Sequence, residues 1–180
     1  MRNAGARDAG PRVKKNWVAP GDGWIKINVD GAFSSTAGDG GIGVVVRDSH
    51  DTALLSSWRY IPRAKEAEEM EAMAAREGLI LAAERFHHRA MLETDCSTVA
   101  IALRHRDDRR SNLKFILEEA IEAGARLPEW TAVHTRRECN SAAHELAQLA
   151  RRTKHSSVWQ SAMPVCIEQI IARDCNQLPE

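Results

Sequence analysis

Hydrophobic and polar residues alternate along residues 25–30, where every odd position is apolar and every even position is polar. A period of two is typical of a β-strand with two different faces, so we predict a strand over about 24–33. The polar face ends in Asp30, and Gly31 follows it directly. An aspartate before a glycine most often only begins a turn, so its meaning depends on the rest of the chain.

Two further apolar stretches follow closely along the chain. They predict strands over about 41–48 and 52–59, joined by the short polar segment 48–51. Connections this short force neighbouring strands to run in opposite directions. The first three strands are therefore expected to form an antiparallel unit.

After Pro62, apolar residues recur at intervals of three and four, which is typical of helices. Helices are predicted at about 63–85, 96–103, 112–123 and 141–152, with strands at about 90–95 and 127–134. We expect Gly124 to end its helix in the left-handed conformation and Asn140 to cap the last helix. This order predicts an α/β fold: a five-stranded mixed sheet, strands one to three antiparallel and strands one, four and five parallel, with helices on both faces.

Length and composition fit one globular domain with tails. The chain has 180 residues, of which 43% are hydrophobic and 28% charged, both ordinary values for such a domain. We expect a flexible basic lead-in over 1–20, the domain over 21–153, and a C-terminal segment over 154–180 that packs on it. The protein is expected to be a monomer.

Charge and cysteine content exclude several classes of protein. The net charge is zero, which excludes the whole-molecule basic field of a nucleic-acid coat protein, although basic residues gather in 1–15 and 134–155. Four cysteines without metal-binding spacing predict free thiols in a reducing compartment. With no secretory signal and no apolar run of the roughly 18 residues that cross a membrane, an intracellular protein, nuclear or cytoplasmic, is expected.

Three acidic residues are expected to meet at one edge of the sheet. Asp30 lies near the end of the first strand and Asp95 at the end of the fourth, and ligands bind at the carboxyl ends of such strands. Glu71, near the start of the long helix, can face the same crevice. Each has a plainer interpretation, since Glu71 belongs to an acidic run and Asp95 precedes a helix that it can cap. Together they predict a site for a hard divalent cation such as Mg²⁺ or Mn²⁺.

Four segments in this order resemble the motifs of the ribonuclease H fold: residues 28–32, 71–79, 92–96 and 137–147. The resemblance is closer to the reverse-transcriptase-like domains found in plants and related to retroelements, and it covers about residues 17–152. It implies a metal-dependent endonuclease that hydrolyses the RNA strand of RNA–DNA hybrids with two Mg²⁺ or Mn²⁺ ions.

The resemblance implies that Asp30, Glu71 and Asp95 are catalytic and bind the metal ions. His144 stands where many ribonucleases H have a fourth aspartate, so it is the fourth candidate for both roles. An imidazole ligand would favour Mn²⁺, while a proton shuttle or a solvent-facing histidine are alternatives. His134 matches a mobile-loop histidine of the family and is a further catalytic candidate, or a strand-end histidine without a task.

Contacts with nucleic acid are expected from glycine backbone and from polar side chains near these motifs. The candidates are Gly31, Gly38, Gly40, Gly41, Arg136, Arg137 and Asn140. Glycine permits a close approach of its backbone to a ligand, and arginine suits phosphate.

Two alternatives to the nuclease remain open at this point. The first is a ribonuclease H-like module that binds nucleic acid but has weak or lost catalysis, which the histidine at position 144 favours. The second is a retroelement-derived protein-interaction domain that uses the apolar residues of the segment 158–171. Those residues also suit packing back on the domain.

Overall fold

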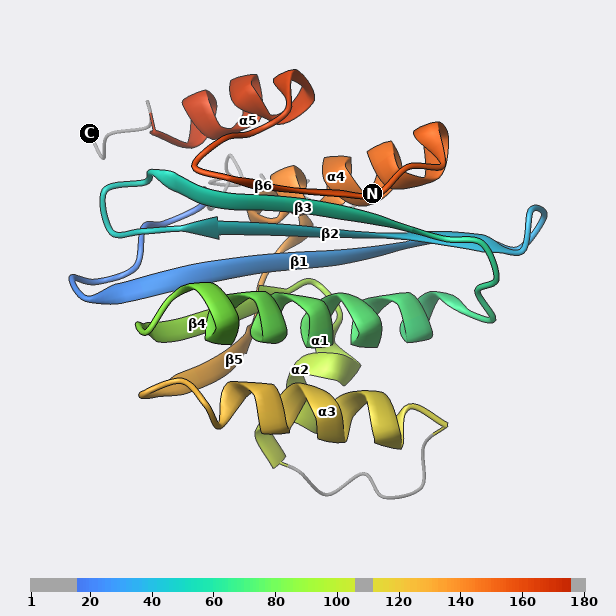
Figure 1. The fold of residues 1–180 in the computed structure, drawn as a ribbon, viewed down its shortest axis with the longest axis horizontal. Coiled ribbons are helices and arrows are strands. Elements are labelled where there is room, and N and C mark those ends of the chain that lie inside the picture. Colours follow the sequence, from blue (N-terminus) through green and yellow to red (C-terminus); the bar gives the residue numbers. More distant parts are fainter. Residues whose placement is uncertain (1–15, 106–111, 176–180) are drawn as a thin grey trace, which may run out of the picture.

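The computed structural model describes residues 16–105 and 112–175, so residues 1–15 of the predicted lead-in 1–20, the loop 106–111 and residues 176–180 lie outside it. A single six-stranded sheet in the order β5-β4-β1-β2-β3-β6 runs through the molecule (Figure 1). The strands are β1 (Trp24–Ser34), β2 (Asp39–Arg47), β3 (Ala53–Ile61), β4 (Arg89–Thr94), β5 (Trp130–His134) and β6 (Ser157–Gln160). The helices are α1 (Ala67–Arg85), α2 (Ser97–His105), α3 (Lys114–Gly124), the short 3₁₀ helix η1 (Arg137–Cys139), α4 (Ser141–Thr153) and α5 (Val165–Cys175).

Strand directions agree with the prediction from the sequence. β1 pairs antiparallel with β2, and β2 with β3, whereas β1 pairs parallel with β4, and β4 with β5. The predicted number of five strands is wrong by one, because β6 adds to the free edge of β3 in antiparallel register. A four-residue strand is too short to show a period of its own, so its structure depends on pairing with β3.

Helices cover both faces of the sheet (Figure 1). On one face, Ile27, Val29 and Leu79 belong to the larger apolar core, which α1, α2 and α3 close. On the other face, Val45, Leu146 and residues of α5 form a second core. Because β1 is covered on both faces, its polar side chains are buried as well, which alternation alone does not indicate.

Two predictions about helix ends differ from the structure. α1 begins at Ala67, because the backbone N–H of Ala64 donates to the carbonyl of Gly38 and holds the preceding segment outside the helix. Gly124 ends α3 without a left-handed conformation, so that prediction is wrong. A Cβ atom on Gly124 would lie 2.4 Å from the Trp130 ring, and this close packing is what requires glycine there.

Both ends of the described chain contact Arg47, which is buried at the end of β2. Its guanidinium lies 3.6 Å from the ring centroid of Trp17 and donates from Nη1 to Asp174 of α5 at 2.9 Å. The C-terminal segment also buries Ile167 and Ile171 against α4. It thus contacts the domain through β6, which pairs with β3, and through the buried side of α5.

Cys96 and Cys166 are free thiols. In the described part of the chain, every helix is too short or too polar to cross a membrane.

Candidate active site

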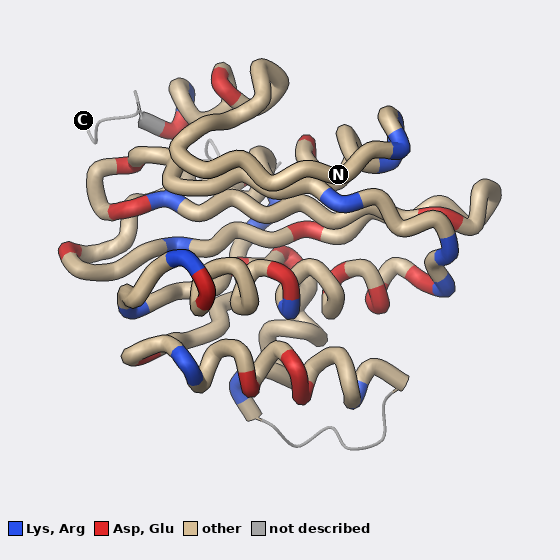
Figure 2. Tube along the Cα trace, in the orientation of Figure 1, with Lys and Arg blue, Asp and Glu red and all other residues tan. Residues whose placement is uncertain are grey.

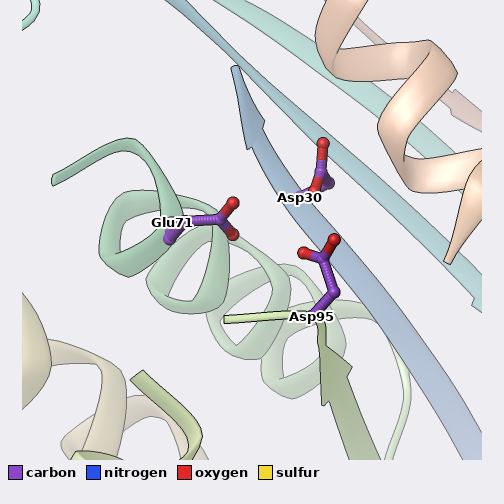
Figure 3. A group of neighbouring side chains, drawn as sticks. All are labelled: Asp30, Glu71 and Asp95. Carbon is purple, nitrogen blue, oxygen red and sulfur yellow. The ribbon is translucent and has the colours of Figure 1, made fainter. Parts of the chain in front are cut away.

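Three elements bring three carboxylates together at the end of the parallel strands. Asp30 comes from β1, Asp95 follows β4 directly, and Glu71 lies in the second turn of α1. One ligand oxygen from each lies within 4.8 Å of the others, and Figure 3 shows all three side chains pointing into the same space. We call these residues the acidic triad.

Gly31 places Glu71 in the acidic triad. A Cβ atom on Gly31 would lie 2.4 Å from the carbonyl carbon of Met70 and 2.5 Å from the backbone nitrogen of Glu71. Only a residue without a side chain lets α1 approach β1 this closely. The backbone N–H of Gly31 also faces the Glu71 carboxylate closely enough to oppose the rise of its pKa. The structure thus gives Gly31 a positioning role.

Burial and repulsion from neighbouring carboxylates disfavour the charged forms of Asp30 and Glu71. Burial, and then repulsion by Asp95, raises the pKa of Asp30 from 3.8 to about 6, although the hydrogen bond from His144 opposes the rise. Burial, followed by repulsion from Asp30 and Asp95, raises the pKa of Glu71 to about 9. Holding several negative charges this close is costly unless a cation joins them.

The acidic triad fits a hard divalent cation. Atom Oε2 of Glu71 is buried and has no hydrogen-bond partner among the described residues. Such an atom loses its contacts with water and gains no hydrogen bond in return. A coordinated cation would compensate for this loss. Carboxylate oxygens from three separate elements are the ligands that Mg²⁺ and Mn²⁺ prefer.

His144 contacts the acidic triad from α4. Its Nδ1 lies 2.9 Å from Oδ2 of Asp30, and this hydrogen bond raises the pKa of the imidazole. The side chain is 37% exposed and stands outside the group of three carboxylates that converge within 4.8 Å. His144 is therefore placed to exchange a proton with Asp30 and with solvent, and it is not merely a solvent-facing residue.

His134 and Arg137 both contact Asp95. The ring nitrogen Nε2 of His134 lies 3.2 Å from the backbone oxygen of Asp95, and the imidazole is exposed. Atom Nε of Arg137 donates to Oδ2 of Asp95 at 3.1 Å. Arg136, its neighbour, is exposed at the start of η1. The order of motifs does not reveal the pairing of Arg137 with Asp95, since 42 residues separate them.

Asn140 is the N-cap residue of α4, as predicted, and its carbonyl accepts from the backbone N–H of His144. Its side chain, however, makes no cap hydrogen bond and turns into the protein. Instead, Nδ2 donates to the carbonyl of Val29 at 2.8 Å, and Oδ1 accepts from Asn28 at 3.2 Å. Asn140 is only 1% exposed. It joins the start of α4, and with it His144, to the strand that carries Asp30, and it presents no surface to a nucleic acid.

The asparagine pair continues into a buried polar network that the sequence did not reveal. Asn28 also donates to Glu93 and accepts from the indole of Trp17. Lys26 pairs with Glu93 at 2.8 Å. The alternation in β1 was a signal for these polar positions, but it does not say that α4 and Trp17 cover them.

The structure also explains the predicted glycines differently. Gly40 and Gly41 lie in β2 under helices, where added Cβ atoms would be 2.2 Å from the sulfur of Met70 and from the carbonyl oxygen of Ala147. Both are buried, so they are required for packing and do not face a ligand. Gly38 lies in the turn before them with φ +66° and has open space around it.

The chain belongs to the reverse transcriptase-like family, whose model matches residues 28–150. Its fold is that of ribonuclease H, as comparison with solved structures shows. Ribonuclease H1 from the halophilic archaeon Halobacterium salinarum NRC-1 is 23% identical with a TM-score of 0.67, covering 73% of this chain and 99% of that one. The N-terminal ribonuclease H domain of a Mycobacterium tuberculosis protein gives the same identity and TM-score, covering 72% and 94%.

A third similar structure is LC11-RNase H1 in complex with an RNA/DNA hybrid, which is 23% identical with a TM-score of 0.64 and covers 72% of this chain and 98% of that one. A comparison with curated proteins gives no match. The expected family and fold are confirmed, while the plant and retroelement origin stays a prediction.

Proposed function

We propose that this protein is a metal-dependent endonuclease that hydrolyses the RNA strand of RNA–DNA hybrids. The observation that carries the proposal is the acidic triad, in which the buried Oε2 of Glu71 has no partner among the described residues. Membership of the reverse transcriptase-like family supports it, and so does similarity to a ribonuclease H1 solved with its hybrid.

Asp30, Glu71 and Asp95 would hold two Mg²⁺ or Mn²⁺ ions, with His144 as a fourth ligand or as a proton carrier beside them. Bound divalent ions supply an activated water and stabilise the charge that develops on the leaving oxygen. The protein side chains would keep the site anionic and oriented. Glu71 would also contact a ribose 2′-hydroxyl, which distinguishes RNA from DNA.

Contacts with the hybrid are expected from a few residues near the site, because the described elements carry no large surface of one charge. Figure 2 shows basic and acidic positions interspersed along the described elements. Arg137, which bonds to Asp95, and its exposed neighbour Arg136 are suited to phosphate. His134 lies exposed at the end of β5, with Nε2 3.2 Å from the backbone oxygen of Asp95, and would help the product to depart, the role that the resemblance implies for it.

A module with weak or lost catalysis is the second candidate. The observation that favours it is that His144 bonds to Asp30 where a fourth carboxylate is expected from the resemblance. A site with three carboxylates and an imidazole would hold a second cation less tightly than a site with four carboxylates.

Cleavage of an end-labelled RNA–DNA hybrid, first in Mg²⁺ and then in Mn²⁺, separates the two candidates. The nuclease cuts the RNA strand, and Asp30→Asn abolishes cutting because the amide keeps the shape of the side chain but loses its negative charge. Circular dichroism should show an unchanged fold. Binding of the hybrid without cleavage in either metal would favour the second candidate. Cleavage by Asp30→Asn within tenfold of wild type would refute the proposed site.

A further inference from the structure

Arg137 reaches the acidic triad from the solvent side. It begins η1, directly before the helix that carries His144, and its side chain is 75% exposed. Its Nε nonetheless donates to Oδ2 of Asp95, whose own side chain is only 9% exposed. The exposed side chain of Arg137 thus forms an ion pair with a nearly buried carboxylate.

The same carboxylate is one of the three that converge on the candidate metal position. Asp95 contributes a ligand oxygen within 4.8 Å of those of Asp30 and Glu71. The guanidinium of Arg137 is attracted to all three acids, most strongly to Asp95. Arg137 therefore supplies positive charge at the place where a divalent cation would supply it.

Two other basic side chains on this side of the sheet, Lys26 and Arg151, are paired with acids outside the acidic triad. Lys26 bonds to Glu93 in a buried position, and Arg151 bonds to Asp39 at 3.2 Å. An exposed arginine differs from these, because its guanidinium can return to water at little cost. Arg137 can therefore leave its carboxylate without unfolding any part of the domain.

We propose that Arg137 is the counter-ion of the acidic triad when no divalent cation is bound, and that a cation displaces it from Asp95. The proposal rests on the proposed function only in requiring the acidic triad to bind divalent cations. Arg137 and the cation compete for the negative charge of one carboxylate, so cation affinity is lower than the three acids alone would give. Displacement leaves the guanidinium free at the mouth of the site.

Isothermal titration calorimetry with Mn²⁺ and with Mg²⁺, in the absence of nucleic acid, tests this competition. Arg137→Gln should bind either cation about tenfold more tightly than wild type, as expected when a unit charge is removed close to a divalent ion at a partly exposed site. The matched control is Arg136→Gln, which removes the same charge one residue away and should leave the affinity within about twofold of wild type. Equal or weaker binding by Arg137→Gln, or equal strengthening by both variants, would overturn the proposal.

Nuclear magnetic resonance of arginine Nε–H groups gives a readout independent of affinity. In the cation-free protein the Arg137 signal should be protected from exchange, and titration with Mg²⁺ should shift it towards the position of a solvated arginine. A signal that stays unchanged at saturating cation would refute displacement. If cations bind and displace Arg137 but no hybrid is cleaved, the proposed function fails while this inference stands. If neither wild type nor Arg137→Gln binds a cation, the inference itself fails.

Discussion

The carboxylate of Asp30 has two kinds of neighbour, and they act on it in opposite ways. Burial and the carboxylate of Asp95 make its charge unfavourable, while the imidazole of His144, 2.9 Å away, makes that charge favourable. The histidine thus compensates part of the cost of burying Asp30 in the cation-free protein. A carboxylate at position 144 would remove that compensation and offer an additional hard ligand instead.

Replacing His144 by aspartate should therefore shift the metal preference. We expect His144→Asp to raise hybrid cleavage in Mg²⁺ by about tenfold and in Mn²⁺ by less, because a carboxylate suits the harder and more demanding Mg²⁺ ion. Initial rates over a range of each metal concentration measure the change.

A control for the charge change is His88→Asp. His88 is exposed and precedes β4, at the opposite end of that strand from Asp95, so its replacement should leave both metal profiles unchanged. If His144→Asp instead lowers the rate and removes a pH dependence near neutrality, His144 acts as a proton carrier. Unchanged kinetics in both metals would mean that position 144 has no part in the reaction.

At the scale of single residues, the acids could be predicted and their partners could not. Asp30, Glu71 and Asp95 follow from strand ends and from the order of motifs along the chain. The hydrogen bonds of Asn140 and Arg137 join residues 111 and 42 positions apart, and these depend on how η1 and α4 approach the sheet. A local pattern contains no information about that approach, so Asn140 was interpreted as an ordinary helix cap.

At the scale of elements, the distance between α4 and β2 determines where His144 lies. α4 crosses β2 over glycines, and a Cβ atom on Gly43 would be 2.1 Å from the carbonyl oxygen of Ala143. Gly43 is also the register partner of Asp30 across the β1–β2 pair. Any side chain at this position would push α4 away from the sheet and His144 away from Asp30.

Gly43→Ala should lower the free energy of unfolding by about 1–3 kcal/mol, the usual cost of forcing extra atoms into a packed interior. Urea unfolding followed by circular dichroism measures it. Gly21→Ala is the matched control, because a Cβ atom there meets nothing within 4 Å, and it should be neutral. Equal stability of both variants would show that α4 can shift without cost.

Elements could be predicted where they are long enough for their hydrophobic positions to repeat at a regular interval. The long strand β1 and the helices α1 and α4 follow from their alternation or helical spacing. β6 has four residues, and its stability comes from the edge of β3, so its own sequence contains too little pattern.

At the scale of the whole molecule, Asp30 and Glu71 of the acidic triad couple folding to pH. The pKa of Asp30 and that of Glu71 are raised, so the folded state binds protons more readily than the unfolded state and becomes less stable as pH rises. The raised pKa of His144 acts in the same direction, since its contribution is full at low pH and is lost as pH rises through the folded value. All three effects make the folded, cation-free protein more stable at acidic pH than at alkaline pH.

The cation-free protein should therefore lose stability between pH 4 and pH 9, with roughly 3 kcal/mol attributable to Asp30 as an upper bound. Saturating Mg²⁺ should remove most of this loss, because it stabilises the ionised carboxylates. Thermal unfolding at several pH values, with EDTA or Mg²⁺, measures both effects. Glu71→Gln is the matched variant: it should be more stable than wild type at pH 7 in EDTA and should gain less from Mg²⁺. A stability in EDTA that rises with pH across this range would contradict the expected sign.

The contact of Arg47 with both Trp17 and Asp174 has a topological consequence. Because one side chain touches residues near both ends of the described chain, a linker of a few residues between positions 16 and 175 would close the backbone into a ring. New ends could then be opened at the exposed turn 35–37 without breaking a strand. A circularly permuted chain that begins at residue 36 should therefore form the same sheet.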